Sequence, residues 1–87
     1  EVETRNIDDV KKVLDHGKVT RIMLDNYSIA ETKKAVNIIN QRFEVESSGG
    51  INELSIASYA KCGVDFISIG ALTHQIKSLD LSFKAIR

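Results

Sequence analysis

The sequence predicts an α/β fold of repeated βα units with parallel strands. Short apolar segments end near four residues, at intervals of 22, 23 and 22 residues along the chain: Glu3, Asp25, Ser48 and Gly70. A stretch with helical patterning follows each of them. Strands that are joined through helices run parallel, so their carboxyl ends share one edge of the sheet. We therefore expect these four residues to converge on one rim.

Three strand candidates are rich in branched and aromatic residues, and each is too short to form an isolated helix. They cover residues 21–25, 43–48 and 64–69. Apolar and polar residues alternate in residues 79–85, which predicts a final strand.

Capping signals place helices between the strands. Ser28 and Glu31 form a capping box, in which each side chain can satisfy a free backbone N–H at the start of a helix. Gly17 is expected to end the first helix, and Cys62-Gly63 the third. We expect four helices, which start near Asn6, at Ser28, at Asn52 and after Gly70.

Length and charge limit the possible functions. The chain has 87 residues, far fewer than the roughly 250 of a closed (β/α) barrel, so we expect a portion of a larger barrel. Twelve basic and twelve acidic side chains leave no net charge to attract a nucleic acid or a membrane surface. The single cysteine, Cys62, cannot form an internal disulfide, which favours a reducing, cytoplasmic setting.

A serine and two glycines, Ser48-Gly49-Gly50, separate a strand from the third predicted helix. Glycines let the backbone approach an anion, and free N–H groups at a helix start favour phosphate. An ordinary βα turn is the alternative. Gly70 makes a second glycine turn one repeat later, and (β/α) barrels often build a phosphate site from their last loops. These four residues are therefore candidate phosphate ligands.

Three further side chains can serve the same rim. Glu3 and Asp25 end the two preceding strands, where carboxylates can hold ribose hydroxyls or Mg²⁺ and can stabilise positive charge on a sugar carbon. Solvation or pairing with basic residues is the alternative. His74 falls one turn into the fourth predicted helix, within reach of an anion at its start. We interpret Glu3 and Asp25 as catalytic and metal-binding candidates and His74 as a phosphate ligand.

Five stretches carry a more specific signal: EVE at 1–3, IMLDN at 22–26, ESSGGI at 46–51, GVDFISIGALTH at 63–74 and LDLS at 79–82. In this order, over almost the whole chain, they resemble the quinolinate phosphoribosyltransferase family, also called nicotinate-nucleotide pyrophosphorylase (carboxylating). Gln75 stands where a small polar residue is expected from that family.

The resemblance implies phosphoribosyl transfer from PRPP to quinolinate with decarboxylation, giving nicotinate mononucleotide, CO₂ and pyrophosphate in NAD biosynthesis. Mg²⁺ accompanies PRPP, with Glu3 and Asp25 near the ribose and metal. Residues 1–87 would be the C-terminal portion of an open, TIM-like barrel domain. The N-terminal sandwich domain, the first part of the barrel and the basic substrate-binding residues would be absent. We expect a homodimer or larger homo-oligomer, and no activity from these residues alone.

Two other hypotheses stay open. The first is a different phosphate-binding α/β-barrel enzyme, which a comparison of quinolinate with other nitrogen heterocycles would separate. The second is a non-catalytic half-barrel that binds a phosphate or a partner protein.

Overall fold

Five strands and three helices form two layers in the computed structural model, which describes residues 1–76. In chain order the elements are β1 (Val2–Thr4), α1 (Ile7–His16), β2 (Arg21–Asp25), α2 (Ile29–Ile39), β3 (Glu44–Ser48), α3 (Ile56–Ala60), β4 (Phe66–Ile69) and β5 (Leu72–Gln75). The strand predicted at 79–85 lies outside the described residues.

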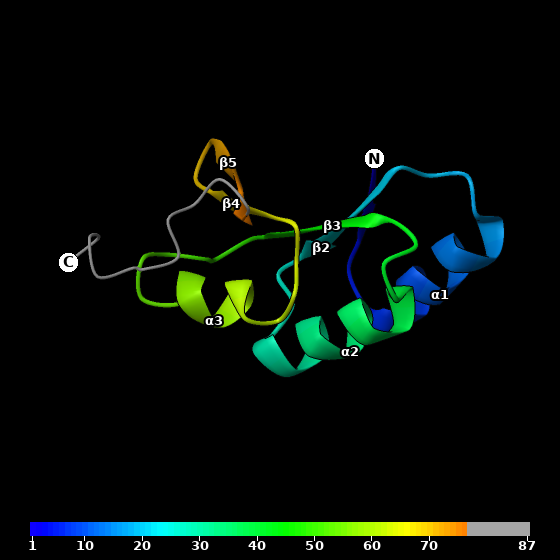
Figure 1. Cartoon of the computed structure of the whole chain (residues 1–87), viewed down its shortest axis with the longest axis horizontal. Coiled ribbons are helices and arrows are strands. Elements are labelled where there is room, and N and C mark those ends of the chain that lie inside the picture. The colour runs from blue at the N-terminus through cyan, green and yellow to red at the C-terminus, as the bar shows by residue number, and fades with distance from the viewer. Residues whose placement is uncertain (77–87) are drawn as a thin grey trace.

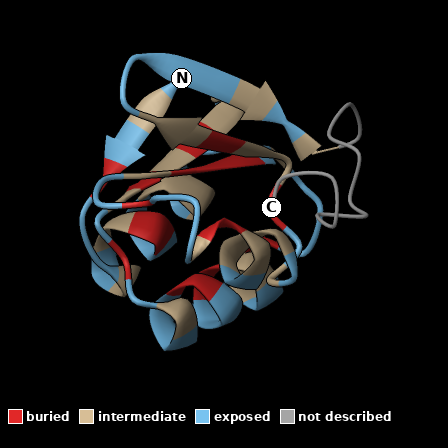
Figure 2. Cartoon of the chain, turned by 90° about the vertical axis from the view of Figure 1, so that its left-hand side faces the viewer, coloured by how far each residue is buried: buried red, intermediate tan, exposed pale blue. Residues whose placement is uncertain are grey.

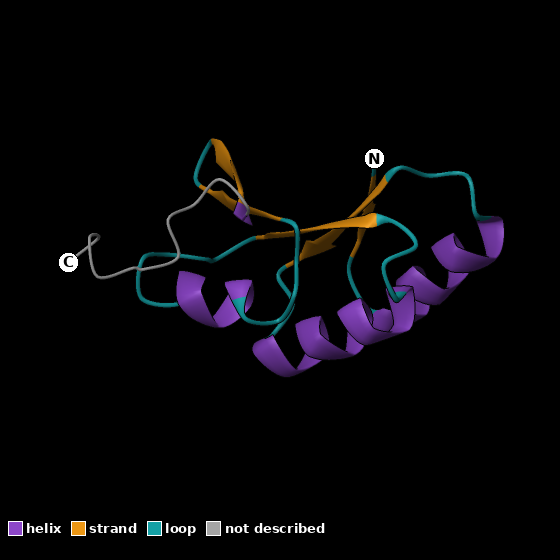
Figure 3. Ribbon diagram, in the orientation of Figure 1, coloured by secondary structure: helices purple, strands orange, loops and turns teal. Residues whose placement is uncertain are grey.

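The sheet has the order β1-β2-β3-β4-β5, and its first four strands are parallel (Figure 1). This confirms the prediction of repeated βα units. The three helices all lie on one side of the sheet, as the separate helix and strand layers in Figure 3 show. The carboxyl ends of β1, β2 and β3 therefore meet at one rim.

Strand alternation divides the sheet into two different faces. Ile22 and Leu24 of β2 point toward the helices and are completely buried, and Figure 2 shows the buried residues gathering between the two layers. Fully buried apolar residues from other elements join them there: Val10, Ala35, Ile39 and Ile67. The opposite face, which no helix of residues 1–76 covers, carries mainly polar side chains of β2, β3 and β4.

The predicted caps of the first two helices are confirmed. The Asn6 side chain accepts a hydrogen bond from Asp9 N at the start of α1. Ser28 and Glu31 make both bonds of the capping box that opens α2. The third helix starts later than predicted, because the Asn52 side chain accepts bonds from the backbone N–H groups of residues 54 and 55 and forms a turn.

The prediction of a fourth helix after Gly70 is wrong. Leu72–Gln75 forms strand β5, which pairs antiparallel with β4. Gly70 has φ +61° and begins a two-residue connection in which Ile69 pairs directly with Leu72. Glycine with positive φ at the first position of such a turn favours a hairpin, so the chain reverses instead of starting a helix.

Tyr27 locks the first two strand-end loops together. Its hydroxyl lies 2.7 Å from Thr4 Oγ1 and donates to the Asn6 carbonyl, also at 2.7 Å. Thr4 Oγ1 also lies 2.8 Å from the Met23 carbonyl, so two hydroxyl protons are shared among three contacts. Burial raises the pKa of Tyr27, and the charges of Asp9 and Glu31 add to this, while the bond with Thr4 lowers it.

Replacing Tyr27 by Phe tests this lock. At neutral pH we expect the free energy of unfolding to fall by about 1–2 kcal/mol, because a buried hydroxyl network loses its central member. A raised pKa in the folded state means that the stabilisation is complete below pH of about 10 and is lost as the pH rises through the folded value. The difference between wild type and Tyr27→Phe should therefore shrink in urea unfolding measured from pH 8 to 11.

Tyr59→Phe is the matched control, since the Tyr59 hydroxyl donates to the Tyr27 carbonyl and its loss leaves the Tyr27 phenol in place. The free energy of unfolding of Tyr59→Phe should fall at alkaline pH by the same amount as that of the wild type. A wild-type to Tyr27→Phe difference that stays constant over the whole pH range would contradict the assignment.

Candidate functional site

Carboxylates from two strands meet at the rim of the uncovered face. Asp25 ends β2 and pairs with Ser48 at the end of β3, and Glu3 of β1 shares their face because it pairs with Met23. The Arg5 guanidinium joins the two carboxylates, 3.2 Å from Glu3 and 3.8 Å from Asp25. The structure therefore brings together Glu3, Asp25 and Ser48, as the sequence predicted.

The loop after β3 packs directly on the loop after β2. Asn26 N donates to the Ser48 carbonyl at 2.8 Å, which extends the pairing by one step beyond the strands. Gly49 has φ +85°, and a methyl group there would lie 2.9 Å from Asn26 N and 3.0 Å from Asp25 Oδ1. This position therefore requires glycine both for its backbone conformation and for the close approach of the carboxylate loop.

Several polar groups of this loop have no protein partner. The Ser48 hydroxyl is buried, and it makes no hydrogen bond within the described part of the chain. The backbone N–H groups of Gly49 and Gly50 also donate no hydrogen bond among residues 1–76. Buried or converging donors without a partner are uncommon, and a bound anion would satisfy them. The arrangement suits an oxyanion beside the two carboxylates.

Gly70 lies at the same edge of the sheet, in the turn after β4, but His74 does not join the carboxylate cluster. Gly70 turns the chain between β4 and β5, and a methyl group there would meet nothing within 4 Å. His74 pairs with Ile67, whose side chain is buried under the helices, so the imidazole belongs to the face opposite Asp25. The earlier placement of His74 one turn into a helix fails together with the helix itself.

Arg5 is the residue of the rim that sequence reasoning missed. It follows β1 directly, whereas no basic residue lies within two positions after β2, β3 or β4. Its place directly after the first predicted strand end, near Glu3, could have identified Arg5 as a residue of the rim. With 73% of its side chain exposed, Arg5 is held by weak surface ion pairs and can exchange partners.

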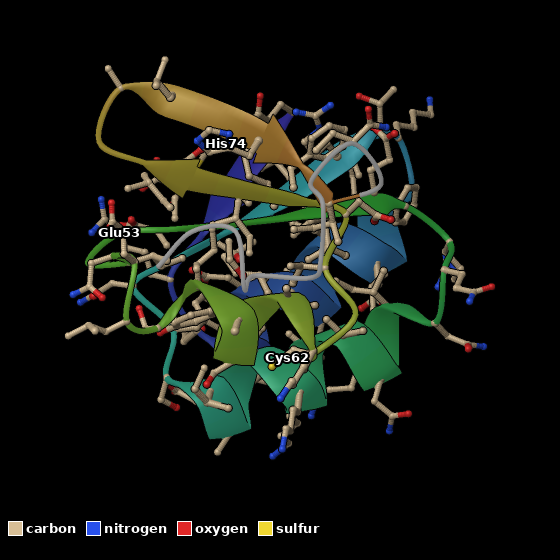
Figure 4. All side chains as sticks on the ribbon, turned by 60° about the vertical axis from the view of Figure 1, so that its left-hand side comes forward. Glu53, Cys62 and His74 are labelled. Atoms are coloured by element: carbon tan, nitrogen blue, oxygen red, sulfur yellow. The ribbon has the colours of Figure 1, made fainter. Side chains whose placement is uncertain are left out.

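Other reactive side chains lie apart from one another. Figure 4 shows His74 on the β4–β5 hairpin, Glu53 on the loop after β3 and Cys62 on the helical side. Burial raises the pKa of the Cys62 thiol, more than the charge of Lys33 lowers it, so Cys62 is a poor nucleophile.

Residues 1–76 form neither a cluster of metal ligands nor a helix that could span a membrane. No group of three or more His, Cys, Asp or Glu side chains gathers there for a metal ion. No helix of these residues is long and apolar enough to cross a membrane.

Comparisons with known proteins agree with this geometry. The family model for the quinolinate phosphoribosyl transferase C-terminal domain matches residues 1–84. The chloroplastic nicotinate-nucleotide pyrophosphorylase [carboxylating] of Arabidopsis thaliana is 43% identical over 97% of this chain and 28% of its own length. A probable nicotinate-nucleotide pyrophosphorylase [carboxylating] of Methanocaldococcus jannaschii is 42% identical over 100% of this chain and 33% of its own length.

The fold agrees as well. A crystal structure of nicotinate-nucleotide pyrophosphorylase from Ehrlichia chaffeensis superposes with a TM-score of 0.73 at 45% identity, over 77% of this chain and 24% of that one. This confirms the predicted fold class, βα units with parallel strands from an open α/β barrel. The chain spans a third or less of the length of these relatives. It belongs to the quinolinate phosphoribosyl transferase family, as a part of its C-terminal domain.

Proposed function

We propose that the protein carrying this chain transfers a phosphoribosyl group from PRPP to quinolinate with decarboxylation, in NAD biosynthesis. The observation that carries the proposal is the pair of carboxylates at the ends of β1 and β2 beside a glycine loop with unpartnered N–H groups. Family membership supports the same reaction. The products are nicotinate mononucleotide, CO₂ and pyrophosphate.

Glu3 and Asp25 are the proposed catalytic residues. The bond between the sugar C1 and pyrophosphate is largely broken before the bond from C1 to the ring nitrogen is complete, so positive charge develops on the sugar. Loss of CO₂ then leaves its bonding electron pair on the ring carbon, which takes up a proton. Carboxylates fixed near that carbon stabilise the charge more in the transition state than in the bound substrate, which is what lowers the barrier. The 29% exposed Asp25 side chain, held on the edge of the rim, suits this role.

A divalent metal would accompany PRPP, and we propose Mg²⁺. Mg²⁺ is commonly held by one or two carboxylates together with substrate phosphates and water, and Glu3 and Asp25 offer that donor set. When bound, the metal neutralises charge on the pyrophosphate group. Arg5 now occupies the same carboxylates, and because exposed ion pairs contribute at most about 1 kcal/mol, it can release them and meet the polyanionic substrate.

The glycine loops are proposed to hold the 5′-phosphate. Ser48, Gly49 and Gly50 supply a buried hydroxyl and two N–H groups beside Asp25. Gly70 forms the neighbouring turn. We also propose His74, on strand β5 of that hairpin, as a phosphate ligand. Its pairing with the buried Ile67 places it on the helix side of the sheet, so the geometry supports His74 less than it supports Ser48, Gly49 and Gly50.

The remaining parts of the site come from other segments. We propose that residues 1–87 are the C-terminal portion of a barrel domain, and that the basic residues for two anionic substrates lie elsewhere in the protein and in a second subunit. A homodimer or higher homo-oligomer follows from that arrangement. We also propose a cytoplasmic location, with which the half-buried free thiol of Cys62 is compatible.

Substrate choice tests the proposed function directly. The purified whole protein should release pyrophosphate from PRPP with quinolinate, and not with nicotinate or other nitrogen heterocycles. Release with a different heterocycle would favour another phosphate-binding barrel enzyme. No release with any of them would favour a non-catalytic module.

Asp25→Asn tests the catalytic assignment. The change keeps the shape and removes the charge, so we expect kcat/KM to fall by about 100-fold or more while the circular dichroism spectrum stays unchanged. Asp15→Asn, on an exposed position of α1, is the control and should show wild-type kinetics. Wild-type kinetics for Asp25→Asn would remove Asp25 from the mechanism.

Gly49→Ala tests the phosphate loop. The methyl group must displace the loop that carries Asn26, so we expect the KM for PRPP to rise about tenfold or more. Gly17→Ala is the matched control, because Gly17 has a similar φ of +76° but its nearest neighbour would be 3.9 Å away. Both variants should lose stability, while an unchanged KM for PRPP in Gly49→Ala would show that the loop does not bind the substrate.

A further inference from the structure

One carboxylate on the uncovered face, that of Glu46, is buried below the rim. Only 3% of Glu46, in the middle of β3, is exposed. Its Oε1 accepts from Arg21 Nη1 at 3.1 Å, and its Oε2 accepts from the Ser68 hydroxyl at 2.6 Å. Burying a carboxylate is costly unless both oxygens are bonded, and here each oxygen has a partner on a different neighbouring strand.

Arg21 is a fixed counterion for this carboxylate. Its guanidinium lies 3.6 Å from the centre of the Phe66 ring and also pairs with Glu44 at 3.4 Å. Burial alone would lower the pKa of Arg21, but the hydrogen bonds and charges of Glu46 and Glu44 outweigh it and raise the pKa overall. Arg21 therefore stays charged, and it holds the β2 side of the Glu46 carboxylate.

The bond to Ser68 matters because the backbone pairing of β3 with β4 is short. β2 and β3 pair over five residues, up to the rim, whereas β3 and β4 pair at only two positions and stop at Ser47 and Ile67. Ser68 lies one residue beyond that point, and its bond to Glu46 is the only hydrogen bond between side chains of these two strands within residues 1–76.

The bridge runs diagonally toward the two glycine loops. Glu46 pairs with Phe66, so Ser68 lies two residues further along β4, level with Ser48 and two residues before Gly70. Ser68 Oγ is also 2.9 Å from Thr73 Oγ1 on β5. A single carboxylate is thus connected to both strands of the hairpin that Gly70 turns.

We propose that Glu46 is a positioning residue, which acts through Ser68 to set the spacing between the Ser48-Gly49-Gly50 loop and the Gly70 turn. The inference rests on the proposed function, because that function assigns both loops to one phosphate group. A phosphate that must contact two loops binds best when their separation is fixed before it arrives.

Ser68→Ala in the whole protein breaks the bridge on the β4 side and leaves the Glu46 to Arg21 pair intact. We expect the KM for PRPP to rise about tenfold, with kcat and the KM for quinolinate within about twofold of wild type. Ser68→Thr keeps a hydroxyl and should restore the KM for PRPP. Glu46→Gln, which weakens a charge-assisted bond without removing it, should give an intermediate increase.

Glu44→Gln is the matched control. Glu44 lies on the same strand and face and shares Arg21 with Glu46, but it is exposed and does not contact β4. It should leave the KM for PRPP unchanged. A purely structural role for the bridge predicts a lower thermal midpoint with unchanged KM values, and that result would overturn the proposal.

Calorimetric titration of inorganic phosphate separates this inference from the proposed function. If quinolinate and PRPP prove not to be substrates, wild type should still bind phosphate and Ser68→Ala should bind it about tenfold more weakly. Equal phosphate affinity in the two proteins, or no phosphate binding by wild type, would overturn the inference. An active Ser68→Ala enzyme with an unchanged KM for PRPP would also overturn the inference. That result would not affect the proposed reaction.

Discussion

The parallel pairing of β2 with β3 is the constraint on which the rest of the structure depends. Its five-residue register places Asp25 beside Ser48 at the rim and Ile22 beside Val45 in the core. Because side chains alternate between faces, a slip of one residue would exchange the two sets and bury Asp25 under the helices. The hydrophobic core and the candidate site therefore require the same register, and selection for either one preserves the other.

Two arginines on this sheet make ion pairs of different kinds. Arg5 is exposed at the rim, where its pairs with Glu3 and Asp25 contribute at most about 1 kcal/mol and can be exchanged for substrate or metal. Arg21, 26% exposed, faces a carboxylate whose side chain is only 4% exposed, so removing Arg21 would leave a buried charge without its counterion. The first pair suits binding that must be reversible, and the second suits a part of the sheet that must not move.

The sequence was sufficient wherever a local signal agreed with the fold. The interval between strand ends and the capping box at Ser28 were found in the structure as predicted. Gly49 has the positive φ that favours glycine, and its role as a phosphate ligand stays a prediction. The failures had non-local causes. Gly70 suits a helix start as well as a hairpin turn, and only the pairing of β5 with β4 decides between them. The buried position of Glu46 has no local signal, because its partners Arg21 and Ser68 are 25 and 22 residues away in the sequence.

The contrast between local and non-local interactions also applies to the sheet itself, where a side-chain bond connects two strands beyond the end of their backbone pairing. The candidate site draws carboxylates from β1 and β2 and phosphate-binding loops from β3 and the β4–β5 hairpin, so its geometry is only as exact as the sheet between them. Backbone pairing fixes β2 against β3 up to the rim but leaves the upper parts of β3 and β4 unpaired. A buried carboxylate with a partner on each side supplies the missing connection at that point.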